Sequence, residues 1–180
     1  MIRAVVVLAA LSLVGCAGLA PVAPTTPASW VLEGRIAVRS SEDGSSASLR
    51  WEQRDAAVLV QLSGPAGRGA TELSGSPEYI RIRRAGVDEV IEGPPPQVMS
   101  RQLGWFVPLE YASAWLQGEP APDAEVDVYE RDSRGRVLHF EQAGFELRVE
   151  WGETRPVRVA LQRDDLKVMV RIRRWSTSSA

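Results

Sequence analysis

The fold class is decided by the stretch Phe145-Glu146-Leu147-Arg148-Val149-Glu150-Trp151. Apolar and charged side chains alternate through its whole length, and a period of two indicates a β-strand with one buried face. Successive side chains of a strand point to opposite faces, so the four apolar residues require a core on one side. We therefore expect residues 145–151 to form a strand of a sheet that faces solvent on its other side.

The same alternation recurs along the chain. It is seen in residues 32–38, 49–52, 58–62, 80–83, 157–161 and 166–172, and it predicts that Val157, Val159 and Leu161 share a buried face. Turn signals such as Glu42-Asp43-Gly44 and Asp164-Asp165 separate these segments. Short strands at regular spacing with this punctuation are typical of an antiparallel sheet or barrel.

Two helices are predicted in the middle of the chain. The stretch 94–103 starts in a proline triplet and ends before Gly104, with Val98, Met99 and Leu103 on one side. The stretch 109–117 follows Pro108 and ends before Gly118, as the capping preferences of proline and glycine favour. The expected order is about six strands, two short helices and about five strands. A curved sheet can then enclose either a packed core or a ligand cavity, and periodicity leaves both open.

The N-terminus predicts a lipidated, secreted protein. Arg3 precedes an apolar run that is too short to span a bilayer and has the form of a signal peptide, residues 1–15. The run ends in Leu13-Val14-Gly15-Cys16, which looks like a bacterial lipobox and implies lipidation of Cys16. We expect residues 16–29 to be a lipidated, proline-rich tether, 30–175 a single domain and 176–180 a flexible tail.

Composition excludes several functions. The chain has 21 basic and 23 acidic residues, so no strong field points to nucleic acid. A late basic cluster, Lys167, Arg171, Arg173 and Arg174, is interpreted as the solvent face of a strand in preference to a docking patch. His139 is the single histidine, and no metal-ligand spacing or nucleophile elbow occurs. We expect no catalysis, no metal and no cofactor.

Four motifs in order resemble the LolB family of outer-membrane lipoproteins. They are Trp30 to Val38, Ser48 to Trp51, Leu62 to Gly67, and Leu103 to Leu109 continuing through Ala114 to Gly118. With the lipobox and the terminal Ile172 to Trp175, the resemblance covers residues 30–175. It implies a mainly β fold, an open antiparallel β-barrel of about eleven strands with a small helical lid.

The resemblance also implies a function. Members accept lipoproteins from a periplasmic LolA-type carrier, hold their acyl chains in a hydrophobic cavity and insert them into the outer membrane. The expected partners are that carrier, acylated lipoproteins and the outer membrane through the lipid anchor, and the expected state is a monomer on the periplasmic face. Position 17 is alanine, so the aspartate that resembles an inner-membrane retention signal is missing.

Two candidate sites follow from the resemblance. The acyl-chain cavity is assigned to inward-facing apolar residues of strands and lid: Leu32, Ile36, Leu49, Trp51, Val60, Leu62, Trp105, Phe106, Leu109, Trp115, Leu116, Phe145, Leu147 and Val149. The membrane-insertion loop is Gly64, Pro65, Ala66, Gly67 and Arg68. The family carries a bulky leucine where this chain has Ala66, and Arg68 can compensate in part by meeting anionic headgroups. An ordinary glycine-rich hairpin loop is the alternative for these residues.

Two other readings of the residues stay open. A non-catalytic lipoprotein that scaffolds an envelope complex would have the same anchor and a filled barrel. A soluble lipid carrier would share the fold, but the lipobox argues against it because a shuttle must leave the membrane.

Overall fold

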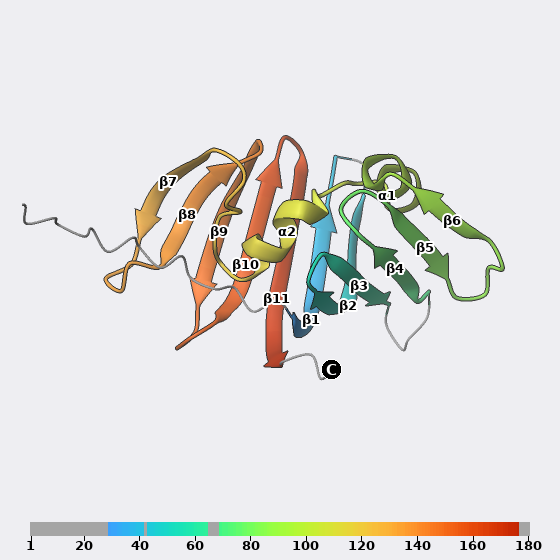
Figure 1. The fold of residues 1–180 in the computed structure, drawn as a ribbon, viewed down its shortest axis with the longest axis horizontal. Coiled ribbons are helices and arrows are strands. Elements are labelled where there is room, and N and C mark those ends of the chain that lie inside the picture. The colour runs from blue at the N-terminus through green and yellow to red at the C-terminus, as the bar shows by residue number, and fades with distance from the viewer. Residues whose placement is uncertain (1–28, 42, 65–68, 177–180) are drawn as a thin grey trace, which may run out of the picture.

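The protein forms one curved antiparallel sheet that encloses two short helices (Figure 1). The structure is a computed structural model and describes residues 29–41, 43–64 and 69–176. Within these residues the strands are β1 Ser29–Arg39, β2 Gly44–Arg54, β3 Ala57–Ser63, β4 Thr71–Gly75, β5 Ile80–Arg84, β6 Val90–Gly93, β7 Val126–Arg131, β8 Val137–Gln142, β9 Phe145–Trp151, β10 Pro156–Arg163 and β11 Leu166–Ser176. The helices α1, Pro95–Leu103, and α2, Leu109–Leu116, lie between β6 and β7.

The chain starts in the centre of the sheet and returns to it. The strand order is β6-β5-β4-β3-β2-β1-β11-β10-β9-β8-β7, so β1 pairs with β11 and the two edges are β6 and β7. Each half grows by hairpins, and the helical segment carries the chain from one edge to the other. Since β6 and β7 do not pair, the sheet is an open barrel, and the predicted fold class is confirmed.

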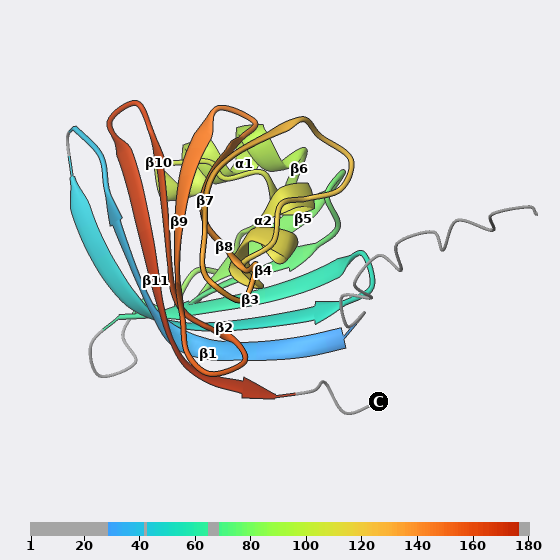
Figure 2. The same cartoon turned by 90° about the vertical axis from the view of Figure 1, so that its left-hand side faces the viewer.

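The central strands are long and bent (Figure 2). The pairing of β1 with β11 shifts register between Glu33 and Gly34, and such a bulge increases local twist. A side chain at position 34 would run into the backbone carbonyl of Arg171. Glycine is therefore required there, because the two central strands approach more closely than a Cβ atom allows.

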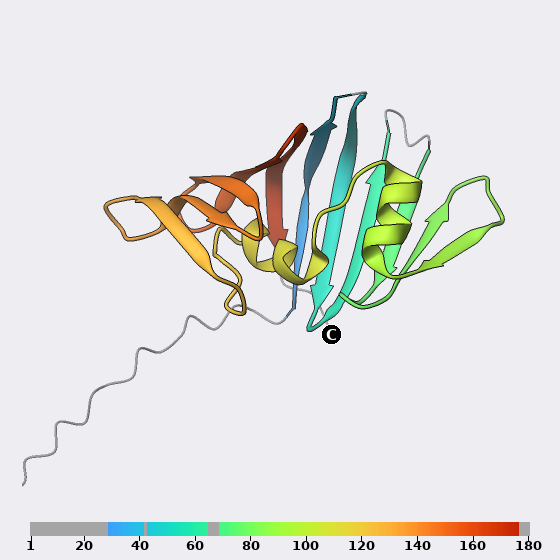
Figure 3. The same ribbon diagram turned by 90° about the horizontal axis from the view of Figure 1, so that it is seen from above.

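Both helices lie on the concave side of the sheet, between its two edges (Figure 3). Helix α1 has proline in its first turn and ends at Gly104, whose φ of 78° is left-handed. Helix α2 begins after Pro108 and buries Leu109, Ala112, Trp115 and Leu116. These are the two helices that the sequence predicts, to within one residue at each end. Neither is long and apolar enough to cross a bilayer.

One predicted face is interrupted. Val159 and Leu161 are buried as expected, but Val157 is 46% exposed and the expectation for it is wrong. The pairing of β10 with β9 shifts register between Pro156 and Arg158. This bulge lets the ring of Pro156 take the inward position and turns Val157 to the outside, a change that a strict period of two does not anticipate.

Candidate functional site

A small apolar cavity lies between the concave face of the sheet and the two helices. Its volume is about 60 Å³, and Thr71 is the only one of the described residues in its lining that is not apolar. No charged side chain among the described residues lines it. Because such walls offer almost no hydrogen-bond partners, the cavity suits an aliphatic ligand and excludes a polar one.

Nine of the fourteen residues predicted for the cavity line it. They come from three strands and from the helical segment: Ile36, Leu49, Trp51, Val60, Leu62, Trp105, Leu109, Trp115 and Leu116. Leu62 and Trp105 are half-buried and the others are buried. Trp51 also stacks on Trp30, with ring centroids 6.3 Å apart, which fixes one wall of the cavity.

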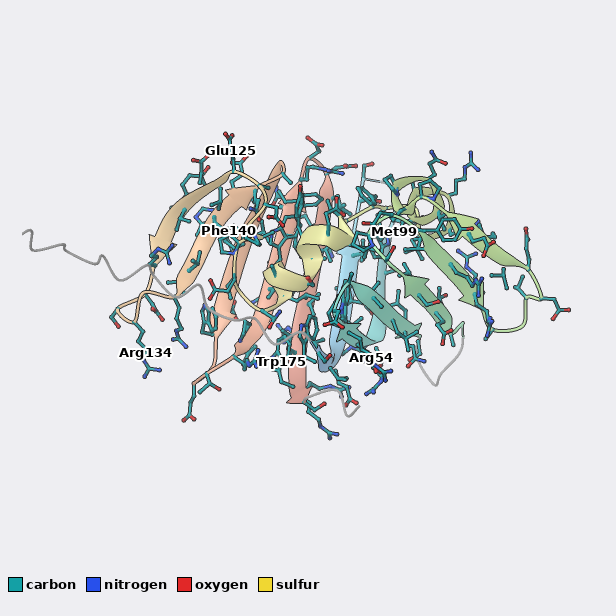
Figure 4. All side chains as sticks on the ribbon, viewed as in Figure 1. Arg54, Met99, Glu125, Arg134, Phe140 and Trp175 are labelled. Atoms are coloured by element: carbon teal, nitrogen blue, oxygen red, sulfur yellow. The ribbon has the colours of Figure 1, made fainter. Side chains whose placement is uncertain are left out.

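The other five predicted residues lie elsewhere. Leu32, Phe145, Leu147 and Val149 are buried in the solid part of the core, and Phe106 is half-buried. Phe145 packs on Trp115 with ring centroids 5.4 Å apart. Strand β9 belongs to the β7 half of the sheet, where aromatic side chains fill the space beneath α2. In Figure 4 the buried Phe140 marks this packed half, and Met99 marks the half beside α1 that contains cavity walls.

Ten further residues line the cavity that were not assigned to it from the sequence: Thr71, Leu73, Met99, Leu103, Val107, Ala112, Val159, Leu161, Val168 and Val170. Most of them show the same apolar periodicity as the residues that were predicted, because they lie on the apolar faces of the predicted helices and of the last two strands. Thr71 and Leu73 carry none. Strand β4 has a single buried residue, Leu73, so it shows no alternation.

The cavity is closed in this structure. Ligand-binding pockets for small organic molecules usually have volumes of about 300–1,000 Å³, which is several times larger than the 60 Å³ found here. A long alkyl chain therefore requires the helices to move away from the sheet. Trp105 is a half-buried wall residue between α1 and α2, so the segment that joins the helices separates the cavity from solvent.

Helix α2 is held at its C-terminal end by one buried glutamine. The side-chain oxygen of Gln142 accepts hydrogen bonds from Trp115 Nε1 and from the backbone N–H of Ala121, both at 2.8 Å. Its amide nitrogen donates to the carbonyls of Ala121, at 2.8 Å, and Ala124, at 3.0 Å. These four bonds tie α2 and the segment after it to β8. Motion of the lid is consequently expected at α1 and at the joint that contains Trp105.

The second predicted site is described only in part. Gly64 follows β3 and is half-buried, whereas Pro65, Ala66, Gly67 and Arg68 lie outside the described residues. Cys16 and the tether also lie outside them. Across the described ranges, no group of three or more His, Cys, Asp or Glu residues could hold a metal ion.

The comparisons with known proteins cover almost all of the described domain. The family model "Outer membrane lipoprotein LolB" matches residues 28–175. The outer-membrane lipoprotein LolB of Stutzerimonas stutzeri is 34% identical over 153 residues, which cover 81% of this chain and 73% of the relative. The protein of the same name from Halorhodospira halophila is also 34% identical, covering 83% and 76%.

A solved structure is similar in fold. The crystal structure of a LolA superfamily protein from Nitrosomonas europaea aligns with a TM-score of 0.50 at 13% sequence identity. The alignment covers 84% of this chain and 87% of the other. At this identity the likeness concerns the fold alone, which is an open sheet with helices on its concave side.

Proposed function

Because the chain belongs to the LolB family of outer-membrane lipoproteins, we propose that it accepts lipoproteins from a LolA-type periplasmic carrier. It holds their acyl chains between the sheet and the two helices and releases them into the outer membrane. The observation that carries this proposal is the cavity, whose lining is apolar except for Thr71.

Measured from water, burial of the acyl chain in the receptor contributes enough free energy to offset the opening of the lid. Each buried methylene contributes about 0.8 kcal/mol, so a chain of roughly 16 carbons contributes about 12 kcal/mol. Opening exposes apolar lid residues such as Leu109 and Leu116, which cost about 1.5–3 kcal/mol each when fully exposed. The gain exceeds the cost when the helices stay partly in contact with the bound chain.

Transfer needs no covalent step. A difference of about 1.4 kcal/mol in affinity between carrier and receptor gives a tenfold preference, so a few kcal/mol set the direction. The protein therefore acts as a receptor and not as an enzyme. We also propose that it works as a monomer. Its net charge of −2 is in keeping with the further proposal that it binds no nucleic acid.

The anchor and the insertion loop complete the proposal. Lipidation at Cys16 holds the domain at the outer membrane, because a single acyl chain binds only marginally and several anchor durably. The loop from Gly64 to Arg68 meets the membrane. With Ala66 in place of leucine its apolar contact is small, so Arg68 and the rest of the surface must contribute more of the attraction.

The test uses the chain from residue 17 onward, without its anchor. Every buried hydrophobic residue among those described lies between Trp30 and Ile172, so this form keeps the whole described core. It is mixed with a carrier loaded with a labelled lipoprotein. We expect the label to move to the receptor in solution. Retention of the label on a carrier that releases it to an established receptor would contradict the proposal.

The scaffold reading is not favoured. It shares the anchor and the sheet, but nothing in it accounts for family membership over residues 28–175. Family membership, more than the size of the closed cavity, decides between the two.

A further inference from the structure

The outer face of the two central strands, β1 and β11, carries a row of basic side chains. Arg35 of β1 is directly opposite Arg171 of β11, and Arg39 is directly opposite Lys167. All four are exposed. We call these four residues the basic row. The sequence predicts that Lys167 and Arg171 face solvent, and the pairing of β11 with β1 places two arginines from the N-terminal strand beside them.

The charges of the basic row are not neutralised within the described part of the chain. The nearby carboxylates are engaged by other arginines: Glu33 with Arg50 at 2.8 Å, Glu146 with Arg148 at 2.8 Å and Glu150 with Arg158 at 2.7 Å. No described carboxylate lies within ion-pair distance of Arg35, Arg39, Lys167 or Arg171. Like charges directly opposite each other destabilise a sheet, so a binding role is the simplest reason to keep them.

A hollow of about 530 Å³ lies beside the basic row on the same face. Its lining includes the small or flexible side chains of Ala37, Ala160 and Met169 and the cations Arg39 and Lys167. One carboxylate, Glu146, also lines it, and this group is ion-paired with Arg148 at 2.8 Å. Such a hollow accepts a group that is anionic at one end and apolar at the other. Its volume is within the range of pockets that bind small organic molecules.

We propose that the basic row and this hollow bind the anionic phospholipid headgroups of the membrane that holds the anchor. This inference rests on the proposed lipidation of Cys16. Twelve residues separate Cys16 from Ser29, a reach of at most about 40 Å. Arg35 is six residues along β1 from Ser29, about 20 Å, so the tether lets the row reach the bilayer.

The position of the row leaves the cavity free. Arg35 points outward between Gly34 and Ile36, and Ile36 lines the cavity on the inner face of β1. Ser63, at the end of β3, lies in the same cross-strand line, through Ser48 to Arg35. Docking of the outer face therefore brings the end of β3 to the membrane, while the concave face of the sheet stays accessible to the carrier.

The test follows a fluorophore on Ser46→Cys, a residue that lines the hollow, in the full lipidated protein. Cys16 is the only native cysteine and is blocked by lipid, so the label is unique. The protein is reconstituted into phosphatidylcholine vesicles with or without phosphatidylglycerol. We expect protection from acrylamide quenching only with the anionic lipid, weakening as salt is added. A label on Ser74→Cys of β4 is the control position and should stay accessible.

Removing charges from the basic row measures how much each one contributes to membrane docking. One basic side chain near an anionic surface raises the ratio of docked to undocked protein about fivefold. Arg35→Gln with Arg171→Gln removes two such side chains and should therefore lower that ratio about 25-fold. Arg39→Gln with Lys167→Gln should act similarly. The matched control, Arg83→Gln with Arg101→Gln, removes the same charge from β5 and α1 and should leave protection unchanged.

The outcomes separate this inference from the proposed function. Equal quenching in both kinds of vesicle, or loss of protection with the control pair, would overturn it. The Arg35 and Arg171 pair should still accept lipoprotein from the carrier in solution. Loss of that acceptance without change in quenching would assign the row to an acidic carrier surface instead. Failure of the unaltered protein to accept lipoprotein would refute the proposed function and leave the quenching result standing.

Discussion

Ala112→Leu adds three carbon atoms to the side of α2 that faces the cavity. Ala112 is buried and is one of the cavity walls. Cavities destabilise proteins by about 24 cal/mol per Å³, so filling 60 Å³ should stabilise the closed form by about 1.4 kcal/mol. An acyl chain must displace the added side chain from this space. Its affinity should consequently fall about tenfold.

The two effects are measured separately on the anchor-free chain. Urea unfolding should show a higher midpoint for the variant with an unchanged slope. Transfer of labelled lipoprotein from the carrier should then need about ten times more receptor for the same extent. The control is Ala57→Leu on β3, where the side chain is exposed and neither quantity should change.

Two results would refute the reasoning. A stabilised variant that accepts lipoprotein as well as the parent would show that acyl chains bind elsewhere. A variant that unfolds at lower urea would show that the space does not accept the added carbons, because overpacking costs about 1–3 kcal/mol.

Three further predictions concern the stability of the fold, and each is measured by urea unfolding. Gln142→Leu leaves buried N–H donors without acceptors and should lower the free energy of unfolding by about 3 kcal/mol, whereas the exposed Gln162→Leu should change it by less than about 0.5 kcal/mol. Gly34→Ala should cost about 2–4 kcal/mol, because its Cβ meets a carbonyl of β11; a neutral effect would mean that the central strands can separate. Partial desolvation raises the pKa of Asp132, but hydrogen bonds from Arg136 and Arg134 outweigh it and lower that pKa below its usual 3.8. The stability that the Asp132 carboxylate provides is present above pH 3.8 and is lost as the pH falls further, so the difference between the parent and Asp132→Asn should shrink there and stay constant from pH 5 to 7.

The strands that the sequence predicts best have one buried face and one solvent-exposed face. Strand β9 alternates along its whole length because it packs on a core and faces solvent. Strand β7 is exposed at every position, since it is an edge without a covering layer. Its alternation is limited to Val126, Asp127 and Val128, which is too short a run to identify a strand. Element type is therefore readable where burial is one-sided, and it is lost where burial is absent.

The cavity is harder to predict than the core. Phe145 and Leu49 carry the same signal, a large apolar residue on an inward face, yet Phe145 packs against Trp115 and Leu49 lines the cavity. The difference depends on which helix residue stands opposite each one. That pairing comes from the crossover between the two sheet edges, a nonlocal property that periodicity within one strand does not contain.

The most direct test of the account asks where the acyl chain lies. Leu73 and Ser74 are neighbours on β4, with Leu73 in the cavity wall and Ser74 on the opposite face of the sheet. A photoreactive amino acid is placed at either position, and the receptor is loaded from a carrier whose lipoprotein has a labelled acyl chain. We predict that illumination crosslinks the label at position 73 and leaves position 74 unmodified. Equal crosslinking at both positions, or crosslinking at 74 alone, would contradict binding of acyl chains beneath the helices.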